Sequence, residues 1–194
     1  MFLFYALPIG LILGFLLGGR PSGLANLNFR WGMLAVAGFA VQLVLFSGPV
    51  SERIGDQAGP VLYVASTALV LVAVLANLRI PGMVLVAIGA ASNLAAILAN
   101  GGYMPASHAP AVGPDGIAVY SNTRIFASPA LQPLTDVIAL PDWLPFTNIA
   151  SIGDLLIGVG IAIVIAASMR ATRPTPPEPP HGSTEPVLEG NSPV

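Results

Sequence analysis

Five long apolar stretches constrain this chain more than any other feature of its sequence. Each runs for about 20 residues without a charged side chain, except that the last contains Asp154. A helix needs about 20 apolar residues to cross the hydrocarbon core of a bilayer, and its backbone polar groups have to be satisfied within the segment. We therefore predict five transmembrane helices, over residues 2–19, 31–49, 58–78, 80–100 and 150–169.

The composition supports the same class of protein. Of the 194 residues, 55% are hydrophobic and only 8% are charged, whereas soluble domains carry about 25% charged residues. We predict an all-α, polytopic membrane helix bundle over residues 1–170, surrounded by the lipid bilayer of the cell (cytoplasmic) membrane. Residues 171–194 are rich in Pro, Ser and Glu and have too little apolar surface to offset the entropy of ordering. They are predicted to form a disordered cytoplasmic tail.

The arginines predict the orientation of the bundle. Cytoplasmic flanks of membrane proteins carry an excess of Lys and Arg. The first apolar stretch has no basic residue before it, so we expect an uncleaved helix and not a secretory signal. With the N-terminus outside and the C-terminus in the cytoplasm, only Arg53 and Arg124 lie on the outer side. The cytoplasmic side then holds Arg20, Arg30, Arg79, Arg170 and Arg173.

A long outer loop, residues 102–148, joins the fourth and fifth predicted helices. Loops longer than about 12–15 residues are functional or disordered, and this one is too apolar for a free segment, so it should pack on the outer mouth of the bundle. Within it, "SPALQPLTDVIALPDWLPF" predicts a short interfacial helix with Trp143 and Phe146 at the level of the lipid headgroups. A re-entrant hairpin is the alternative.

The first helix carries the strongest packing signal. Gly10, Gly14 and Gly18 recur at four-residue intervals, and small residues in this pattern let helix backbones approach closely in lipid. We expect a tight contact with another helix of the same chain. Association with a protein partner or a second copy through the same glycines is the alternative.

Asp154, in "NIASIGDLLIGVG", has two interpretations. Ser151 and Asp154 form an S-x-x-D version of the capping box that begins many helices, and an anion in the first turn also complements the helix dipole. Alternatively, Asp154 is a buried carboxylate that binds or relays a cation, because ionisable residues inside a membrane are often functional. Both interpretations stay open.

Other polar residues are expected near Asp154. Asn93 and Asn100 lie on one face of the fourth helix, which ends on the side where the fifth begins. Arg124 from the outer loop is a candidate ion-pair partner that would hold the loop over the bundle. Together with Ser151, these residues either lock the loop as a lid or line a site for a small solute or cation.

Three motifs carry a family resemblance. "LANGGYMP" and "SIGDLLIGVG", separated by a loop that contains "LTDVIALP", resemble an uncharacterised family of small bacterial multi-pass membrane proteins with a domain of unknown function, DUF 5317. The resemblance covers roughly residues 1–170. It implies a membrane protein of about five helices and no particular activity.

No motif in the chain is typical of an enzyme. The sequence lacks a phosphate-binding G-x-x-x-x-G-K-[ST] loop, an H-E-x-x-H zinc motif, a G-x-S-x-G elbow and cysteine. We therefore predict no catalytic residue, cofactor or metal site, and the scattered arginines predict no nucleic-acid binding. We expect a non-catalytic membrane subunit or scaffold. The alternative is a protein that binds or transports a small solute or cation at the outer polar residues, and an enzyme is the least favoured hypothesis.

Overall fold

The computed structural model describes residues 3–106, 123–141 and 149–171. The predicted cytoplasmic tail lies outside these ranges, except for Ala171. So do Trp143 and Phe146, which were expected at the headgroups. Everything below concerns the described part of the chain.

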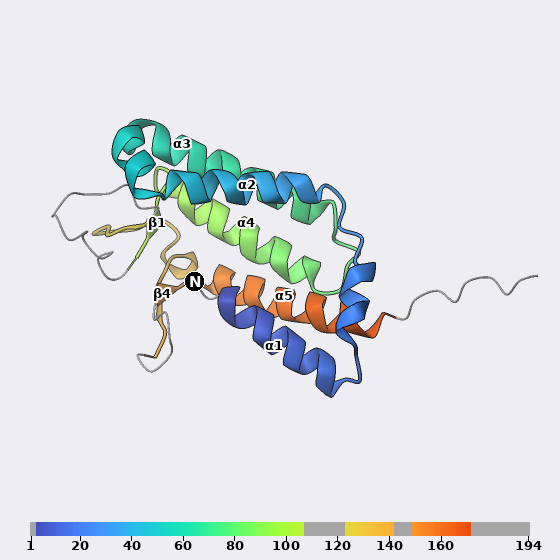
Figure 1. Cartoon of the computed structure of the whole chain (residues 1–194). Helices are drawn as coiled ribbons and strands as arrows, with labels where there is room; N and C mark the ends of the chain where they lie inside the picture. Colours follow the sequence, from blue (N-terminus) through green and yellow to red (C-terminus); the bar gives the residue numbers. More distant parts are fainter. Residues whose placement is uncertain (1–2, 107–122, 142–148, 172–194) are drawn as a thin grey trace, which may run out of the picture.

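The described residues are mostly helical (Figure 1), which confirms the predicted class of secondary structure. Two helices, α3 and α5, contain stretches long and apolar enough to cross a membrane, and the other three α-helices are apolar but shorter. The helices are α1 (Leu3–Leu16), α2 (Gly32–Leu45), α3 (Gly48–Leu75), α4 (Met83–Ala99) and α5 (Ile152–Arg170), with 3-10 helices η1 (Pro21–Asn26) and η2 (Gln132–Leu134).

The start of α3 differs most from the prediction. The third helix was expected over residues 58–78, but α3 begins at Gly48 and includes the polar connection expected between two helices. Pro49 stands in its first turn, where the fixed φ of proline favours helix initiation, and Pro60 lies inside it. Polar residues limit the part of a helix that is able to cross a membrane, but they do not by themselves end the helix.

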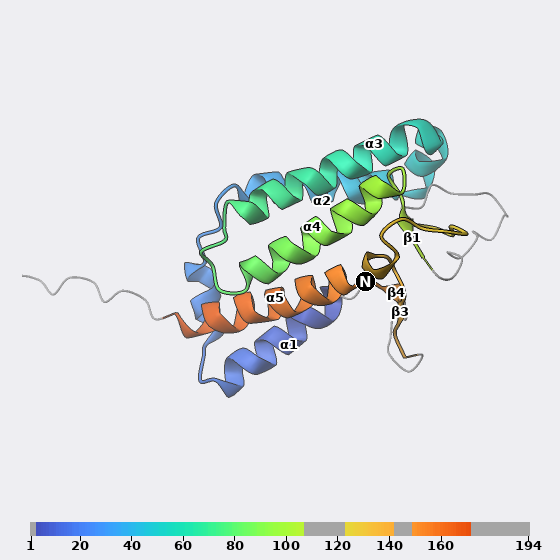
Figure 2. The ribbon, with the colours of Figure 1, turned by 180° about the vertical axis from the view of Figure 1, so that it is seen from behind.

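The five α-helices lie in a row and do not enclose a central helix. The extensive contacts join α1 to α5, α5 to α4, α4 to α3 and α3 to α2 (Figures 1 and 2). Among the described elements, α1 has no comparable contact with α2, α3 or α4. The spatial order is therefore α1–α5–α4–α3–α2, with the last helix of the chain inserted beside the first.

Glycines allow α4 and α5 to approach closely. A Cβ atom added to Gly153 would lie 2.7 Å from the carbonyl oxygen of Gly89, and one added to Gly160 would lie 2.7 Å from that of Gly82. Gly82 also has a φ of +91°, a conformation that disfavours other residues. Because a real Cβ does not fit at these distances, the contact depends on small residues; helix pairs that associate in lipid use small residues in the same way.

The other two close helix pairs also use glycine. A Cβ on Gly10 would lie 2.9 Å from the Cβ of Ile165, and one on Gly14 would meet the side chain of Met169, so both glycines of α1 face α5 in the same chain. Gly18 lies beyond the end of α1 and has no neighbour that a Cβ would meet within 4 Å. In the α2–α3 pair, a Cβ on Gly38 would lie 2.8 Å from the carbonyl oxygen of Ser66.

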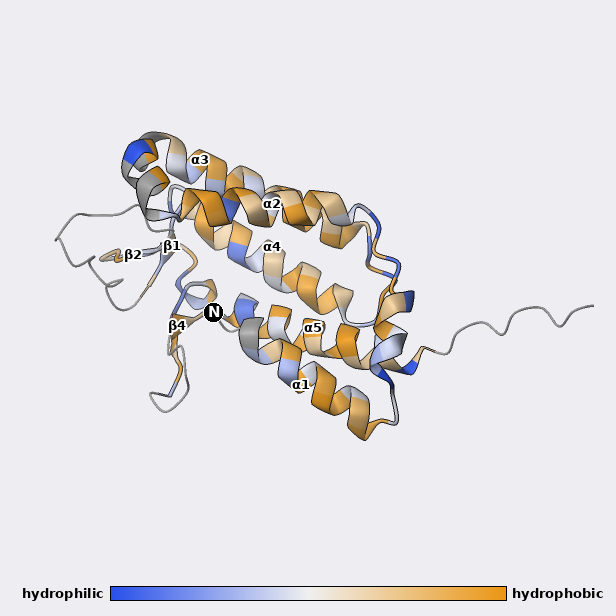
Figure 3. Ribbon diagram, in the orientation of Figure 1, coloured by the Kyte–Doolittle hydropathy of each residue, from blue (hydrophilic) through white to orange (hydrophobic). Residues whose placement is uncertain are grey.

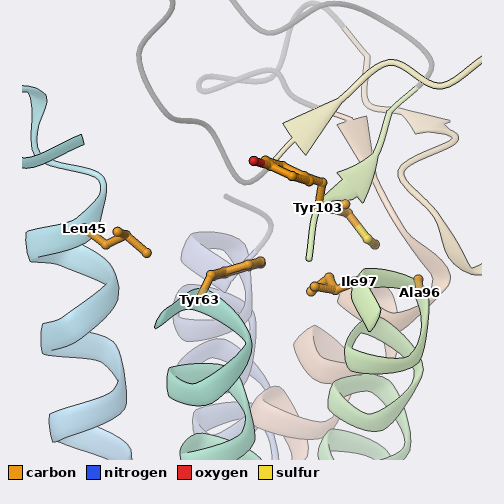
Figure 4. Close-up of a cluster of buried hydrophobic side chains, with 6 residues drawn as sticks. Leu45, Tyr63, Ala96, Ile97 and Tyr103 are labelled. Atoms are coloured by element: carbon orange, nitrogen blue, oxygen red, sulfur yellow. The ribbon is translucent and has the colours of Figure 1, made fainter. Parts of the chain in front are cut away.

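Two clusters of buried apolar side chains lie between the helices of the row. The first joins α2, α3 and α4 to the segment that follows α4 (Figure 4), and it consists of Leu45, Tyr63, Ala96, Ile97, Tyr103 and Met104. The second lies at the opposite ends of α3 and α4 and includes Val164 of α5. The first cluster therefore attaches the outer segment to the helices.

We call residues 101–106 and 123–141 the cap. The cap contains strands β1 (Met104–Pro105), β2 (Thr123–Arg124) and β3 (Ile138–Ala139). β1 pairs in parallel with β2, and β3 pairs antiparallel with β4 (Ile149–Ala150), the residues that lead into α5. In the described part of the expected interfacial helix, the chain forms η2 and β3, and Leu131 has a left-handed φ of 52° that interrupts any helical path. The cap is thus a small folded unit at one end of the row.

Candidate functional site

The start of α5 is built by its own side chains. Ser151 is the N-cap residue; its Oγ accepts a hydrogen bond from the backbone N–H of Asp154 at 3.0 Å. In return, the backbone N–H of Ser151 donates to Oδ2 of Asp154 at 3.1 Å. The capping box predicted from the S-x-x-D motif is therefore confirmed. It satisfies two backbone donors that a helix start leaves free.

Asn93 of α4 completes this arrangement from the neighbouring helix. Its Nδ2 donates to Oδ1 of Asp154 at 2.8 Å, and its Oδ1 accepts from the hydroxyl of Ser151 at 2.9 Å. Both oxygens of the Asp154 carboxylate thus accept a hydrogen bond. We call the three side chains of Asn93, Ser151 and Asp154 the polar ring.

Close backbone approach makes the polar ring possible. Ser151 is completely buried, while Asn93 and Asp154 are half-buried. Gly153 lies between the capping-box residues Ser151 and Asp154, and a Cβ at this position would collide with Oδ1 of Asn93. Glycine at this position therefore allows a short asparagine side chain to reach both partners on α5.

Asn100 does not join the polar ring but fastens the cap. Its Nδ2 donates to the carbonyl oxygen of Ala96 at 2.8 Å and to that of Ala130 at 2.9 Å, and its Oδ1 accepts from the N–H of Ala130 at 2.9 Å. The amide side chain thus pairs with the peptide groups of Ala130 as a strand neighbour would. Asn100 is 8% exposed, and its bond to Ala96 is buried, whereas its two bonds to Ala130 are partly buried.

Asn77 repeats this arrangement at the other end of the helices, and the sequence analysis missed it. Its Nδ2 donates to the carbonyl oxygens of Ala73 and Arg30, both at 2.7 Å, and its Oδ1 accepts from the N–H of Arg30 at 2.8 Å. Asn77 fastens the turn before α2 as Asn100 fastens the cap. A repeated tripeptide was the available signal, since Leu-Ala-Asn ends both α3 and α4.

Arg124 lies in the cap, where its guanidinium stacks on an aromatic ring. The Arg124 Cζ atom is 3.8 Å from the ring centroid of Tyr103, a cation–π geometry. Within the ranges that the structure describes, no ion pair joins Arg124 to Asp154. Tyr103 belongs to the first apolar cluster, so this contact ties β2 to the helices.

Asp136 is the second residue that the sequence analysis did not single out. It lies in the cap between η2 and β3, and its Oδ1 atom is buried without a hydrogen-bond partner. Burial raises the pKa of Asp136 from 3.8 to about 7, and the negative charge of Asp154 acts in the same direction. The Asp136 carboxyl is therefore close to the start of α5 but does not belong to the polar ring.

The chemistry available at this end of the molecule is that of hydrogen bonds and protons. The described residues bring no three His, Cys, Asp or Glu side chains together in an arrangement that could hold a metal ion. The sequence predicted one shared site for five polar residues, namely Asn93, Asn100, Arg124, Ser151 and Asp154. The structure joins three of them in the polar ring and uses the other two to hold the cap.

Fold and site together define a class of protein: a row of apolar helices, held by glycine contacts, with a small cap fastened over the start of its last helix. Residues 26–166 match the model of a family described as "Family of unknown function (DUF5317)", and the chain belongs to this family. The match includes the polar ring, both asparagine contacts and the cap, and leaves α1 outside. No curated protein matches the chain, and no solved structure does.

Proposed function

We propose that this protein is a multi-pass integral membrane protein with a non-catalytic role, as a subunit or scaffold that displays the cap on the outer side of a cell membrane. The five α-helices anchor it in the bilayer. The cap is its surface for recognition by other proteins.

Exposed apolar side chains support the membrane location. Large hydrophobic residues are exposed on every α-helix, among them Leu16 (77%), Met33 (79%), Leu43 (76%), Val61 (67%) and Leu98 (57%). Figure 3 shows mostly apolar colouring along the α-helices, with hydrophilic colouring mainly near their ends and in the connections. Soluble monomers rarely expose contiguous apolar patches of more than a few hundred Å², whereas lipid accommodates such a surface.

The charges and lengths fit the same proposal. Four exposed arginines, Arg20, Arg30, Arg79 and Arg170, flank the helix ends that lie opposite the cap, as expected for a cytoplasmic side. The 17 residues of α4 extend about 25 Å, slightly less than the hydrocarbon thickness of about 30 Å. Local thinning of the bilayer accommodates a difference of this size.

The closed polar ring is the observation that carries the non-catalytic role. Both carboxylate oxygens of Asp154 and the hydroxyl of Ser151 already have partners within the chain. A ligand at this carboxylate would share oxygens that already accept one hydrogen bond each, and Oδ1 accepts the bond that joins α4 to α5. The ring therefore supports a structural clasp in preference to a binding site for a small solute or cation.

Mass spectrometry of the tagged protein tests this proposal. The protein is solubilised mildly from its native membrane and isolated, and both co-isolated proteins and small molecules are quantified. We expect a partner protein in fixed ratio to the wild-type chain and reduced amounts of the chain or of the partner with Asp154→Asn. Ser92→Ala, on the adjacent position of α4, serves as the matched control and should retain both.

The outcome that overturns the proposal is equally specific. A small molecule retained in one-to-one ratio, and released by Asp154→Asn while the chain stays abundant, would make the polar ring a binding site. Recovery of the chain in the soluble fraction, without detergent, would refute the membrane location.

A further inference from the structure

Asp136 is held by backbone contacts between the cap and the start of α5. Its N–H donates to the carbonyl oxygen of Pro105 at 2.9 Å, and its backbone bridges Ala106 in parallel. Two residues later, Ile138 pairs with Ala150, directly before the Ser151 N-cap. Movement of Asp136 is therefore coupled through the backbone both to β1 and to the first turn of α5.

The Asp136 side chain is unusual among the described polar groups. Its Oδ1 is the only buried side-chain nitrogen or oxygen among them that lacks a hydrogen-bond partner. Leaving an ionised carboxylate without a partner away from water is strongly unfavourable, and such groups take up a proton instead. The residue as a whole is partly exposed, so protons reach it from solvent.

The charged groups around Asp136 favour its neutral form. Asp154 of α5 is the charged side chain that most affects it, and its negative charge opposes ionisation. The amino-terminal group of the chain acts in the opposite direction, to a smaller extent than burial and Asp154 together. Arg124, the basic side chain of β2, lies over the ring of Tyr103.

We propose that the carboxyl group of Asp136 is a proton-binding site that controls how tightly the cap closes on the start of α5. When Asp136 holds a proton, the cap closes with a neutral group next to Asp154. When Asp136 is ionised, closure places two negative charges near each other and buries one without a partner. The proposal goes beyond the scaffold role and holds whether or not a partner protein binds the cap.

The direction of the pH effect follows from linkage. In an opened cap, Asp136 is hydrated and has its ordinary pKa of 3.8, whereas in the closed cap its pKa is about 7. The closed state binds the proton more tightly, so it is most favoured below the lower value. As the pH rises from 3.8 toward about 7, the ratio of open to closed cap increases. Above about pH 7 this ratio no longer changes. The cap is therefore tight in mildly acidic surroundings and looser in alkaline ones.

A single introduced cysteine measures opening, because the chain has no cysteine of its own. Ala150 is 2% exposed in β4, beneath the paired β3, so Ala150→Cys should react with a maleimide only when the cap opens. Ala127→Cys, at an exposed position of the cap, corrects for the effect of pH on the thiol itself. Both reporters are made in the full-length chain in detergent, with Asp136 and with Asp136→Asn.

We expect the corrected reaction rate of Ala150→Cys to rise at least about tenfold between about pH 5.5 and about pH 8 when Asp136 is present. With Asp136→Asn, which stays neutral, it should change by less than about twofold. An equal rise in both backgrounds, or no rise in either, overturns the proposal. If Ala150→Cys does not fold, hydrogen exchange of the peptide covering residues 134–139 gives the same comparison between Asp136 and Asp136→Asn.

Discussion

Asn93 of α4 and Asp154 of α5 are joined by a hydrogen bond of 2.8 Å between Nδ2 and Oδ1. The two residues are 61 positions apart in the sequence, and the bond lies beside Gly89 and Gly153, where the two helix backbones approach closely. It links a helix that ends at the cap to a helix that begins there.

Asn93→Ala should destabilise the protein by about 1–3 kcal/mol, because it leaves Oδ1 of Asp154 without its donor and the hydroxyl hydrogen of Ser151 without its acceptor. For a chain of this length, a loss of about 2 kcal/mol lowers the melting temperature by roughly 4–8 °C. Thermal unfolding in detergent measures the change. Ser92→Ala is the control, and an equal loss in both variants would contradict a specific role for the ring.

A double-mutant cycle isolates the bond itself. Asn93→Ala and Asp154→Ala, each of which removes the bond, should not be additive, and we expect a coupling of about 1 kcal/mol. Interhelical hydrogen bonds in membrane proteins average about 0.6 kcal/mol and rarely exceed about 1.7 kcal/mol. Additive effects would show that the bond contributes nothing to stability.

Gly153→Ala should be severely destabilising, by more than about 2 kcal/mol, because overpacking a tight contact forces backbones apart. The new Cβ would collide with Oδ1 of Asn93 and with the backbone of Gly89. Gly32→Ala is the matched control, since a Cβ there meets only the ring of Phe29 at an ordinary 3.5 Å. In detergent, the melting temperature should fall clearly for Gly153→Ala and change little for Gly32→Ala. A Gly153→Ala protein that melts at the wild-type temperature would refute the close contact.

The two buried asparagines should act locally and at opposite ends. Asn100→Ala should raise hydrogen exchange around Ala130 in the cap, and Asn77→Ala should raise it around Arg30 before α2. Each substitution removes the acceptor of one backbone N–H and the donor to one carbonyl oxygen of its partner residue, so that N–H loses the hydrogen bond that protects it from exchange. Exchange measured by mass spectrometry on both variants gives an internal control. Increased exchange at both ends in either variant would indicate general unfolding instead.

Single cysteines should reveal the orientation. With the N-terminus outside, Ala127→Cys in the cap should react in intact cells with a reagent that does not cross membranes. Ser22→Cys in η1 should react only after the cells are permeabilised, because the arginine-flanked helix ends face the cytoplasm. Both positions are exposed. The reverse labelling pattern would refute the proposed orientation.

Local patterns were sufficient to predict some elements. Ser151 and Asp154 are three residues apart, so the capping box needed no knowledge of the rest of the fold, and the apolar stretches predicted helices at all five α-helix positions. Whether the helices span a membrane stays a prediction. The sequence also holds a signal for the α4–α5 contact that the sequence analysis did not use. Gly82 and Gly89 are seven residues apart, as are Gly153 and Gly160, and seven residues make about two turns of a helix.

Other features depend on contacts between distant segments. Asp136 looks like any loop carboxylate until the cap is folded, because its backbone pairs with Ala106 after β1, and β3, two residues later, pairs with β4 before α5. Likewise, nothing near Arg124 in the sequence indicates that Tyr103 receives its guanidinium. Gly18 fits the spacing of a packing motif, but α1 ends before it. The spacing alone therefore predicted three contacting glycines in α1, whereas Gly10 and Gly14 make the contact.

The order of the helices in the row determines when the protein is able to assemble. α5 lies between α1 and α4, so Gly10 and Gly14 have no partner until the final helix has been synthesised. Translation therefore produces two separate pieces, α1 alone and the α2–α4 group, which α5 joins. In the membrane location proposed above, where helices form first and associate afterwards, the first helix remains without α5 until the last helix is inserted, and an interruption of synthesis before α5 leaves it unpaired.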